Sequence, residues 1–206
     1  MHVEINPNNI DDRKIKEIVS VLKADGVIIV PTDTVYAFAC SIFSNKAVDK
    51  ICRFKGVKPE KANLSFLCHD LKNISEYTKP FDRSIYKLLN RSLPGPFTFI
   101  LEASGSVPSI FRAKKKTIGI RIPDHEVTLE IIRQLGHPLM AASLHSEDDP
   151  IKEYLTDPAE IFEKYENAID AIVNSGYGGI EPSTVVDCSG DEITLVREGK
   201  GILELI

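Results

Sequence analysis

Stretches with helical apolar spacing alternate along the chain with short apolar runs, and this alternation predicts an α/β protein. The clearest run is Val27–Val30, four β-branched apolar residues in succession, as expected of a strand buried on both faces. Further strands are predicted over residues 64–68, 97–101, 117–122, 138–143, 168–174, 183–188 and 193–197. Helices are predicted over residues 11–26, 45–56, 70–77, 80–91, 124–135 and 157–166, with one helical turn over 108–112.

Polar residues and glycines mark where these elements begin and end. Asn45 and Asp124 are predicted to cap two of the helices, and Gly26 to end the first helix. The turn Ser189-Gly190-Asp191 predicts a hairpin, which requires antiparallel pairing. We therefore predict one domain over residues 1–206, of the α/β (α+β) class, with a twisted sheet of parallel and antiparallel strands and flanking helices.

The composition is that of an ordinary soluble globular protein, with 43% apolar and 27% charged residues. The start of the chain does not resemble a signal peptide, and no apolar stretch approaches membrane-spanning length, so we expect a cytoplasmic protein without membrane contact. The histidines have no metal-binding spacing, and no metal site is predicted. The widely spaced cysteines are interpreted as reduced core residues: Cys40, Cys52, Cys68 and Cys188.

Basic residues gather in two segments although the net charge is −5. Residues 112–121 contain no acid, and residues 50–61 contain a single one, whereas acids concentrate between residues 147 and 170. A basic face on an acidic protein fits a phosphate-bearing ligand or a local RNA contact. For Lys114–Lys116 a solvated lysine-rich surface is an equally good interpretation.

The candidate chemistry consists of hydroxyls and cations at strand ends. The chain has no Walker loop, GxGxxG, GxSxG or HExxH motif, and nothing in it indicates a covalent nucleophile. Pro31 ends the Val27–Val30 strand and presents Thr32-Asp33-Thr34, although on composition alone a plain strand end explains this stretch better. Hydroxyls with cations bind phosphates and carboxylates, as in enzymes that act by positioning and charge neutralisation. The remaining candidates are Lys55, Lys58, Arg121, Ser143, Ser183, Thr184 and Arg197.

Six motifs in this order carry a resemblance to a known family. The sequence resembles the YrdC/YciO family of threonylcarbamoyl-AMP synthases and their relatives over essentially its whole length. The motifs are Pro31-Thr32-Asp33-Thr34-Val35-Tyr36, the Lys55–Leu67 segment, Pro94-Gly95-Pro96-Phe97-Thr98, Ile118-Gly119-Ile120-Arg121-Ile122-Pro123, Pro182-Ser183-Thr184-Val185-Val186-Asp187 and Arg197-Glu198-Gly199.

The resemblance implies a sheet around a large, positively lined cavity. It also implies a reaction in which ATP, L-threonine and bicarbonate give threonylcarbamoyl-AMP and pyrophosphate with Mg²⁺, for threonylcarbamoyladenosine modification of tRNA. Family members are also described as binding double-stranded RNA, so tRNA or double-stranded RNA is a possible partner. The resemblance assigns catalysis to Lys55, Arg121 and Ser143, substrate binding to Thr32, Thr34 and Lys58, and nucleotide binding to Ser183 and Arg197.

Three departures from the synthase pattern resemble the YciO branch of the family. The Lys-x-Arg motif of synthases is Lys55-Gly56-Val57-Lys58 here, and their Ser-x-Asn is Ser143-Leu144-His145. The glycine expected after the tyrosine is replaced by Ala37. Two alternatives to a synthase therefore stay open: an RNA- or nucleotide-binding protein without synthase chemistry, and a hydrolase that uses the same cavity.

Overall fold

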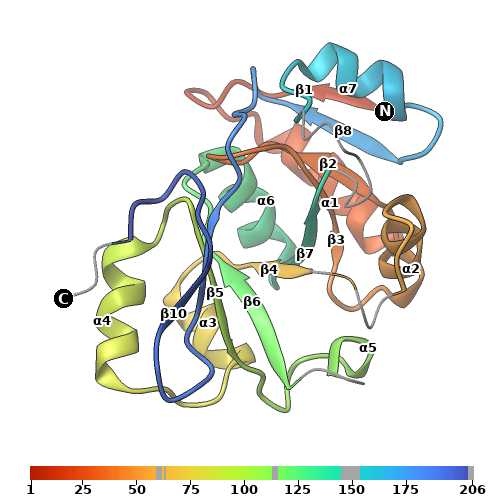
Figure 1. The fold of residues 1–206 in the computed structure, drawn as a ribbon. Coiled ribbons are helices and arrows are strands. Elements are labelled where there is room, and N and C mark those ends of the chain that lie inside the picture. The colour runs from red at the N-terminus through yellow and green to blue at the C-terminus, as the bar shows by residue number, and fades with distance from the viewer. Residues whose placement is uncertain (59–61, 63, 113–115, 145–153, 204–206) are drawn as a thin grey trace.

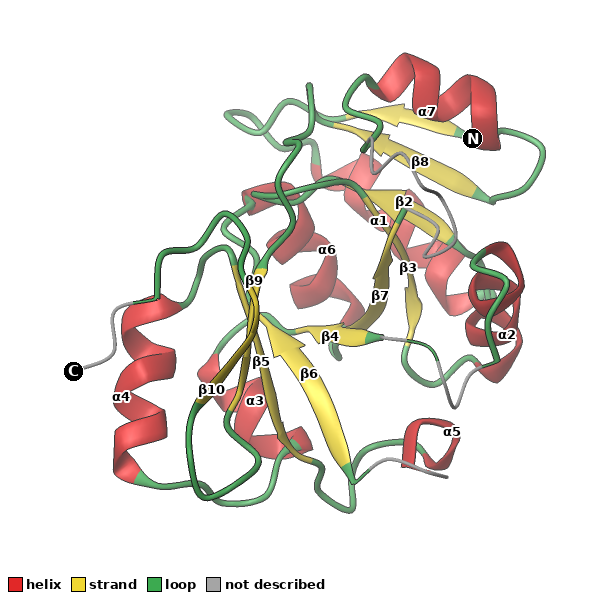
Figure 2. Ribbon diagram, in the orientation of Figure 1, coloured by secondary structure: helices red, strands yellow, loops and turns green. Residues whose placement is uncertain are grey.

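A computed structural model describes residues 1–58, 62, 64–112, 116–144 and 154–203. Within these residues ten strands form one sheet, and seven helices flank it (Figures 1 and 2). The strands are β1 (His2–Glu4), β2 (Ile28–Val30), β3 (Ala37–Ser41), β4 (Ser65–Leu67), β5 (Phe97–Glu102), β6 (Thr117–Arg121), β7 (Leu139–Ser143), β8 (Ala171–Asn174), β9 (Thr184–Asp187) and β10 (Thr194–Arg197). The helices are α1 (Asp12–Lys23), α2 (Asn45–Phe54), α3 (Leu71–Tyr77), α4 (Arg83–Ser92), α5 (Ser109–Arg112), α6 (Glu126–Leu135) and α7 (Pro158–Tyr165).

The sheet mixes parallel and antiparallel pairs, in the order β1-β8-β2-β3-β7-β4-β6-β5-β9-β10. Four neighbouring pairs are parallel: β1/β8, β2/β8, β4/β6 and β5/β9. The others are antiparallel, including the predicted hairpin of β9 and β10. The predicted mixed sheet with flanking helices is therefore confirmed.

Apolar side chains cover both faces of the sheet, as the Val27–Val30 run predicts. Ile28 and Val30 pack with α1 and α6 in one buried cluster. Val27 and Ile29 point the other way, into a larger cluster with side chains of α2, α3 and α4. All four residues are fully buried, because successive side chains of a strand alternate between faces that helices cover on both sides.

Two strands were not predicted from the sequence. β3 is a run of small residues, Ala-Phe-Ala-Cys-Ser, which has neither the alternation nor the β-branched residues typical of strands. It is nevertheless wholly buried, because it pairs with β2 on one side and β7 on the other. β1 is three residues long, and only Val3 is buried. In both cases pairing with distant segments, which local pattern does not reveal, decides the structure.

Two predicted helix caps are wrong by one residue. α2 begins at Asn45, but its cap is Ser44, whose hydroxyl oxygen accepts the Ala47 amide at 3.1 Å. Serine and asparagine are comparably good caps, so the two neighbouring positions were ambiguous. α6 is capped by His125 in place of Asp124, without a side-chain hydrogen bond to the helix.

The predicted end of α1 also shifts by one residue. Asp25 adopts the left-handed conformation (φ 60°), and the Gly26 amide donates to the Val21 carbonyl at 2.9 Å, which completes a Schellman turn. Gly26 is needed for a different reason: a β-carbon there would lie 2.6 Å from the Val21 carbonyl oxygen.

The cysteines and the helix lengths can be compared with the sequence-based expectations. The four cysteines are buried and reduced, as predicted. Burial raises the pKa of Cys188 to about 11 and that of Cys68 still further, so these thiols stay protonated. Among the helices that the structure describes, none is long and apolar enough to cross a membrane.

Candidate functional site

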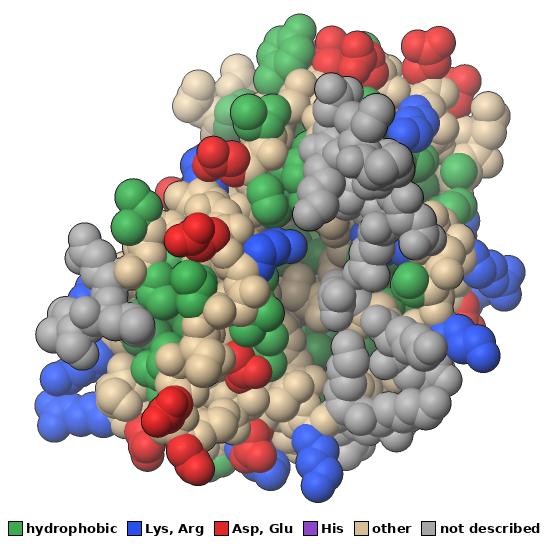
Figure 3. Space-filling model, in the orientation of Figure 1, with side chains coloured by type: hydrophobic (Ala, Val, Ile, Leu, Met, Phe, Trp, Pro, Cys, Tyr) green, Lys and Arg blue, Asp and Glu red, His purple; other side chains and the backbone are tan. Residues whose placement is uncertain are grey.

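One face of the sheet is hollowed into a cavity of about 510 Å³. β3, β4 and β7 each contribute to its lining and to the α1–α6 core, so the cavity adjoins that core on the same face of the sheet. The face drawn in Figure 3 is hollowed at its centre, with a basic side chain at the rim of the hollow. The polar side chains that line the cavity are Thr32, Thr34, Ser65, Thr98, Thr117, Arg121, Ser143, Ser183 and Arg197.

Strand register gives this cavity a cationic end and an apolar end. Gly119 of β6 pairs with Ile100 of β5, and the same register continues to place Arg121 opposite Thr98. Thr98 pairs with Val185 of β9, which in turn pairs with Arg197 of β10. The two arginines therefore lie in one row across four strands.

The other end of the cavity lies along the same strands. Thr117 and Arg121 occupy the same face of β6, about 13 Å apart at the usual strand rise. Around Thr117 the lining is apolar, with Ile118 and Phe111. Between the two ends, Gly119 presents no side chain. The cavity is therefore an elongated trough, and the cations among its described lining residues, Arg121 and Arg197, lie at one end.

The loop after β2 carries Thr32 and Thr34 into the cavity wall. The Thr32 hydroxyl donates to the Val35 carbonyl (2.7 Å) and accepts the Thr34 amide (3.1 Å). Its proton is thus used, so in the 3.0 Å contact between the two hydroxyls Thr34 is the donor. Thr32 has no bonding capacity left and shapes the loop, whereas Thr34 keeps room for one more donor.

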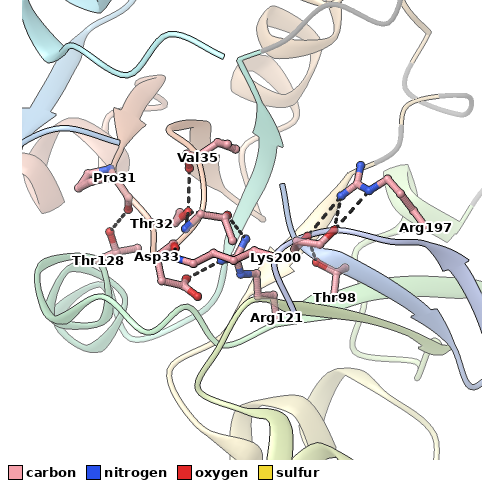
Figure 4. A network of polar contacts seen from close by, with 11 residues as sticks. Pro31, Thr32, Asp33, Val35, Thr98, Arg121, Thr128, Arg197 and Lys200 are labelled. Carbon is pink, nitrogen blue, oxygen red and sulfur yellow. Dashed lines mark hydrogen bonds and ion pairs between the residues drawn. The ribbon is translucent and has the colours of Figure 1, made fainter. Parts of the chain in front are cut away.

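Arg121 anchors this loop from β6 (Figure 4). Its Nη1 donates to the Thr34 hydroxyl at 2.8 Å, and its Nη2 donates to Asp33 Oδ1 at 2.5 Å. The Arg121 and Asp33 side chains are only 7% and 11% exposed. Burial lowers the pKa of Arg121, the Asp33 carboxylate opposes that shift, and the charge of Arg197 adds to it. The Asp33 carboxylate therefore neutralises much of the Arg121 charge in this structure.

Lys55 and Ser143 are brought together by a hydrogen bond, and Lys58 is not part of that contact. The Lys55 side chain is buried, and its ammonium donates to the Ser143 carbonyl at 3.0 Å. Ser143 lines the cavity, whereas Lys55 is not among the described lining residues. Lys58 is exposed and is not among the described residues that line the cavity. His145 of the predicted motif lies outside the described residues, as do Lys114 and Lys115 of the basic run.

The opposite wall joins Ser183 to Arg197. Arg197 Nη2 donates to the Ser183 carbonyl at 2.7 Å and lies 3.4 Å from its hydroxyl. The Ser183 hydroxyl also contacts the Thr98 hydroxyl at 2.8 Å. Thr184, the next residue, is buried, and its hydroxyl donates to the Gly201 carbonyl at 2.6 Å. Its side chain therefore bonds to the backbone of the C-terminal segment. Arg197 is exposed and stands at the open side of the cavity.

Comparisons with known proteins identify the family to which the chain belongs. The family model of the Sua5/YciO/YrdC domain, described as "Telomere recombination", matches residues 20–199. The chain belongs to the Sua5/YciO/YrdC family. It is similar to a Haemophilus influenzae protein (37% identity; 96% of this chain, 94% of that protein) and to Escherichia coli YciO (35%; 96% and 94%). It is also similar to the threonylcarbamoyl-AMP synthase of Bacillus subtilis (30%), covering 92% of this chain and 54% of that protein.

Solved structures of the Sua5/YciO/YrdC family share the fold. The crystal structure of E. coli YciO superposes with a TM-score of 0.90 at 33% identity, over 98% of this chain and 97% of that one. Pyrococcus abyssi Sua5 complexed with L-threonine superposes with a TM-score of 0.86 at 24% identity, over 97% of this chain and 57% of that one. The resemblance predicted from the six motifs, including that to YciO, is confirmed.

Several residues that build the site of this Sua5/YciO/YrdC protein were not predicted. Thr128 of α6 donates to the Pro31 carbonyl at 2.6 Å and so fixes the start of the loop. The sequence feature that could have identified Thr128 is a polar residue on the apolar helix face formed by Val127 and Ile131. Gly179 presses on the same loop, because a β-carbon there would lie 2.2 Å from the Thr34 carbonyl oxygen. Lys200 donates to the Asp33 carbonyl at 2.5 Å.

The burial of His125, the cap residue of α6, leads us to expect that the stability of the protein depends on pH. Its buried Nδ1 has no hydrogen-bond partner within the described residues, and burial lowers its pKa below the ordinary 6.5, against the opposing charge of Asp33. The unfolded chain therefore binds a proton that the folded chain resists, so stability falls as pH drops below about 6.5. His137, whose pKa burial also lowers, contributes in the same direction.

Urea unfolding at about pH 7.5 and 5.5 measures this effect. His125→Gln should show a smaller loss of unfolding free energy between the two values than the unaltered chain. An equal loss in both proteins would contradict the assignment to His125.

Proposed function

We propose that the cavity binds ATP and L-threonine and that the chain forms threonylcarbamoyl-AMP from ATP, L-threonine and bicarbonate, for tRNA modification. The 30% identity to a protein named threonylcarbamoyl-AMP synthase supports this reaction. The observation that carries the proposal is the row of Arg121 and Arg197 across one cavity, with the Thr34 and Ser183 hydroxyls beside them. Contact with tRNA or double-stranded RNA stays a prediction, as does the cytoplasmic location.

The proposed reaction needs positioning and dispersed positive charge. The threonine amine and bicarbonate give a carbamate and release water, and a carbamate oxygen attacks the α-phosphorus of ATP. The new O–P bond forms as the bond to the β-phosphate oxygen breaks, and pyrophosphate leaves. Such a transfer depends mainly on alignment of the two substrates and on neutralisation of the leaving group. Hydroxyls and cations are the side chains suited to that task.

The two ends of the trough suggest the orientation of the nucleotide. Phosphates fit the row of Arg121 and Arg197, where the charge lies. The nucleoside fits the opposite direction, over Gly119 toward Phe111 and Thr117, where the described lining residues are apolar apart from the Thr117 hydroxyl. Phe111 offers an aromatic surface for a base, and an apolar lining with few polar groups is usual in such pockets.

Magnesium fits this site as an ion carried by the phosphates. Mg²⁺ at nucleotide sites is held by one or two carboxylates together with substrate phosphates and water. Among the described residues, no three His, Cys, Asp or Glu side chains gather into a metal-holding group. Asp33, with its Oδ2 free of hydrogen bonds in the described structure, is the carboxylate beside the cavity wall that could assist. When bound, the ion would neutralise phosphate charge.

Pyrophosphate release tests the proposal. Purified protein given ATP, bicarbonate and Mg²⁺ should release pyrophosphate only when L-threonine is present. Lys55→Ala should lower the rate by about 10- to 100-fold, because the Ser143 segment loses its buried anchor and the cavity loses a nearby positive charge. Lys79→Ala, which removes an exposed lysine paired with Glu102, is the matched control and should leave the rate unchanged. The absence of threonine-dependent turnover in the unaltered chain would refute the proposed reaction.

Calorimetry separates binding from chemistry. The unaltered chain should bind ATP, and Lys55→Ala should bind it more weakly. Binding of ATP without any threonine-dependent turnover would favour a nucleotide-binding protein over a synthase.

A further inference from the structure

The segment that follows β10 holds Lys200 in a fixed place beside the cavity. The Lys200 amide donates to the Pro182 carbonyl at 2.9 Å, and the Gly199 amide donates to the Thr184 hydroxyl at 3.0 Å. The fit is close on both sides of Lys200. A β-carbon at Gly199 would lie 2.3 Å from the Pro182 carbonyl oxygen, and one at Gly201 would lie 2.6 Å from the Phe97 ring. The backbone at Lys200 is therefore set by packing, and its side chain is the adjustable part.

The Lys200 side chain bridges from this segment to the loop after β2. Its ammonium donates to the Asp33 carbonyl at 2.5 Å, between two residues, Thr32 and Thr34, that line the cavity. Figure 4 shows Lys200 and Arg121 both extending toward Asp33. Because an ammonium has three protons, the contact with one carbonyl leaves donors available for a ligand.

The charges at this end of the cavity are unequally compensated. Arg121 shares its charge with the Asp33 carboxylate. Lys200 and Arg197 contact neutral oxygen atoms, the Asp33 carbonyl and the Ser183 carbonyl and hydroxyl, and neither forms a salt bridge within the described residues. Among the described residues at this end, the positive charge that is not paired with a carboxylate therefore rests on these two side chains, which contact residues on either side of the Arg121–Asp33 pair.

We propose that Lys200 is a phosphate-binding residue of this site. Its ammonium turns from the Asp33 carbonyl, or shares its protons with it, to bind a phosphate oxygen of the nucleotide or of pyrophosphate. The inference rests on the proposed function, since it assumes that the cavity binds a nucleoside polyphosphate. The competing interpretation is a structural latch, in which Lys200 only ties the C-terminal segment to the loop.

Substitutions at Lys200 distinguish a phosphate-binding role of its charge from a purely structural role of its hydrogen bond. Lys200→Ala removes both the charge and the hydrogen bond, whereas Lys200→Gln keeps a donor for the Asp33 carbonyl and removes only the charge. Lys200→Arg keeps the charge. Calorimetric titration of the full chain with ATP, pyrophosphate and adenosine measures each contribution, and Lys79→Ala serves as the control for loss of one exposed lysine.

Both Lys200→Ala and Lys200→Gln are expected to weaken ATP and pyrophosphate binding by about tenfold, the usual effect of one lost charge-assisted hydrogen bond. Adenosine binding should change by less than about twofold, and Lys200→Arg should restore most of the lost affinity. Unchanged pyrophosphate binding in both uncharged variants would overturn the inference, and so would full recovery by Lys200→Gln, which would identify a latch. If the unaltered chain bound neither ATP nor pyrophosphate, the proposed function itself would fail.

Discussion

Replacing Arg121 with leucine is expected to lower the free energy of unfolding by about 3–5 kcal/mol, because it leaves the Asp33 carboxylate buried without its charged partner. The Thr34 hydroxyl loses its donor from Arg121 in the same variant. Urea unfolding followed by circular dichroism measures the loss, and an unchanged slope against denaturant would show that the unfolded state is not altered.

A double substitution tests whether the ion pair is the cause. Arg121→Leu combined with Asp33→Asn removes both charges, so it should lose less stability than Arg121→Leu alone. Arg133→Leu is the matched control, because Arg133 also forms a 2.5 Å ion pair, with Glu130, but is exposed. This control should leave the unfolding free energy nearly unchanged. Equal losses from Arg121→Leu and Arg133→Leu would contradict the importance of burial.

Much of the fold follows from local pattern. The β-branched run at Val27–Val30 and the alternation at 117–122 became β2 and β6 because their side chains already match a buried sheet. Arg121 was noticeable for the same reason: an arginine in an apolar strand requires a partner or a ligand. Its presence in the cavity wall could therefore be anticipated from the sequence.

The partner of Arg121 could not be anticipated. Asp33 lies 88 residues away in the chain, and only the pairing of β4 with β6 and β7, and of β7 with β3, brings the two together. The same reason hid Lys200, which is 167 residues from Asp33, and the role of Thr128. Local pattern identifies which residues have unusual chemistry, whereas the sheet order decides which of them meet.

For function, the positive charge available to a ligand in the cavity is smaller than the number of cationic side chains implies, because one of them is paired with a carboxylate. Arg121 is held by the Asp33 carboxylate, and Lys200, which was not predicted from the sequence, donates to the loop after β2 beside the cavity. Lys58, which the altered Lys-x-Arg motif had suggested, is exposed and is not itself among the described lining residues, although its carbonyl accepts the amide of Ala62, which lines the cavity. Lys200 is a position outside the six motifs at which the described structure offers a further positive charge beside the cavity.

Filling the middle of the trough at Gly119 is expected to abolish ligand binding without unfolding the chain. A β-carbon at Gly119 would lie 3.3 Å from Ser65 Cβ and 3.4 Å from Thr98 Cγ2, which is close but tolerable with a small shift. The two further methyl groups of valine would occupy the space between the cationic and apolar ends. Gly119→Val should weaken ATP binding by about 100-fold or more, because the nucleotide can no longer span both ends.

Stability should move differently from binding in this series. Replacing a glycine lowers the conformational entropy of the unfolded chain, which stabilises the folded state by about 0.4–1 kcal/mol. This gain offsets the cost of the tight contacts around residue 119. The unfolding free energy of Gly119→Val should therefore stay within about 1 kcal/mol of that of the unaltered chain. The ATP affinity of Gly119→Ala should lie between that of the unaltered chain and that of Gly119→Val. Gly105→Val, at a glycine with nothing within 4 Å of an added β-carbon, should bind ATP normally. Normal ATP binding by a folded Gly119→Val variant would show that the ligand lies elsewhere, because no nucleotide could cross a trough blocked at its centre.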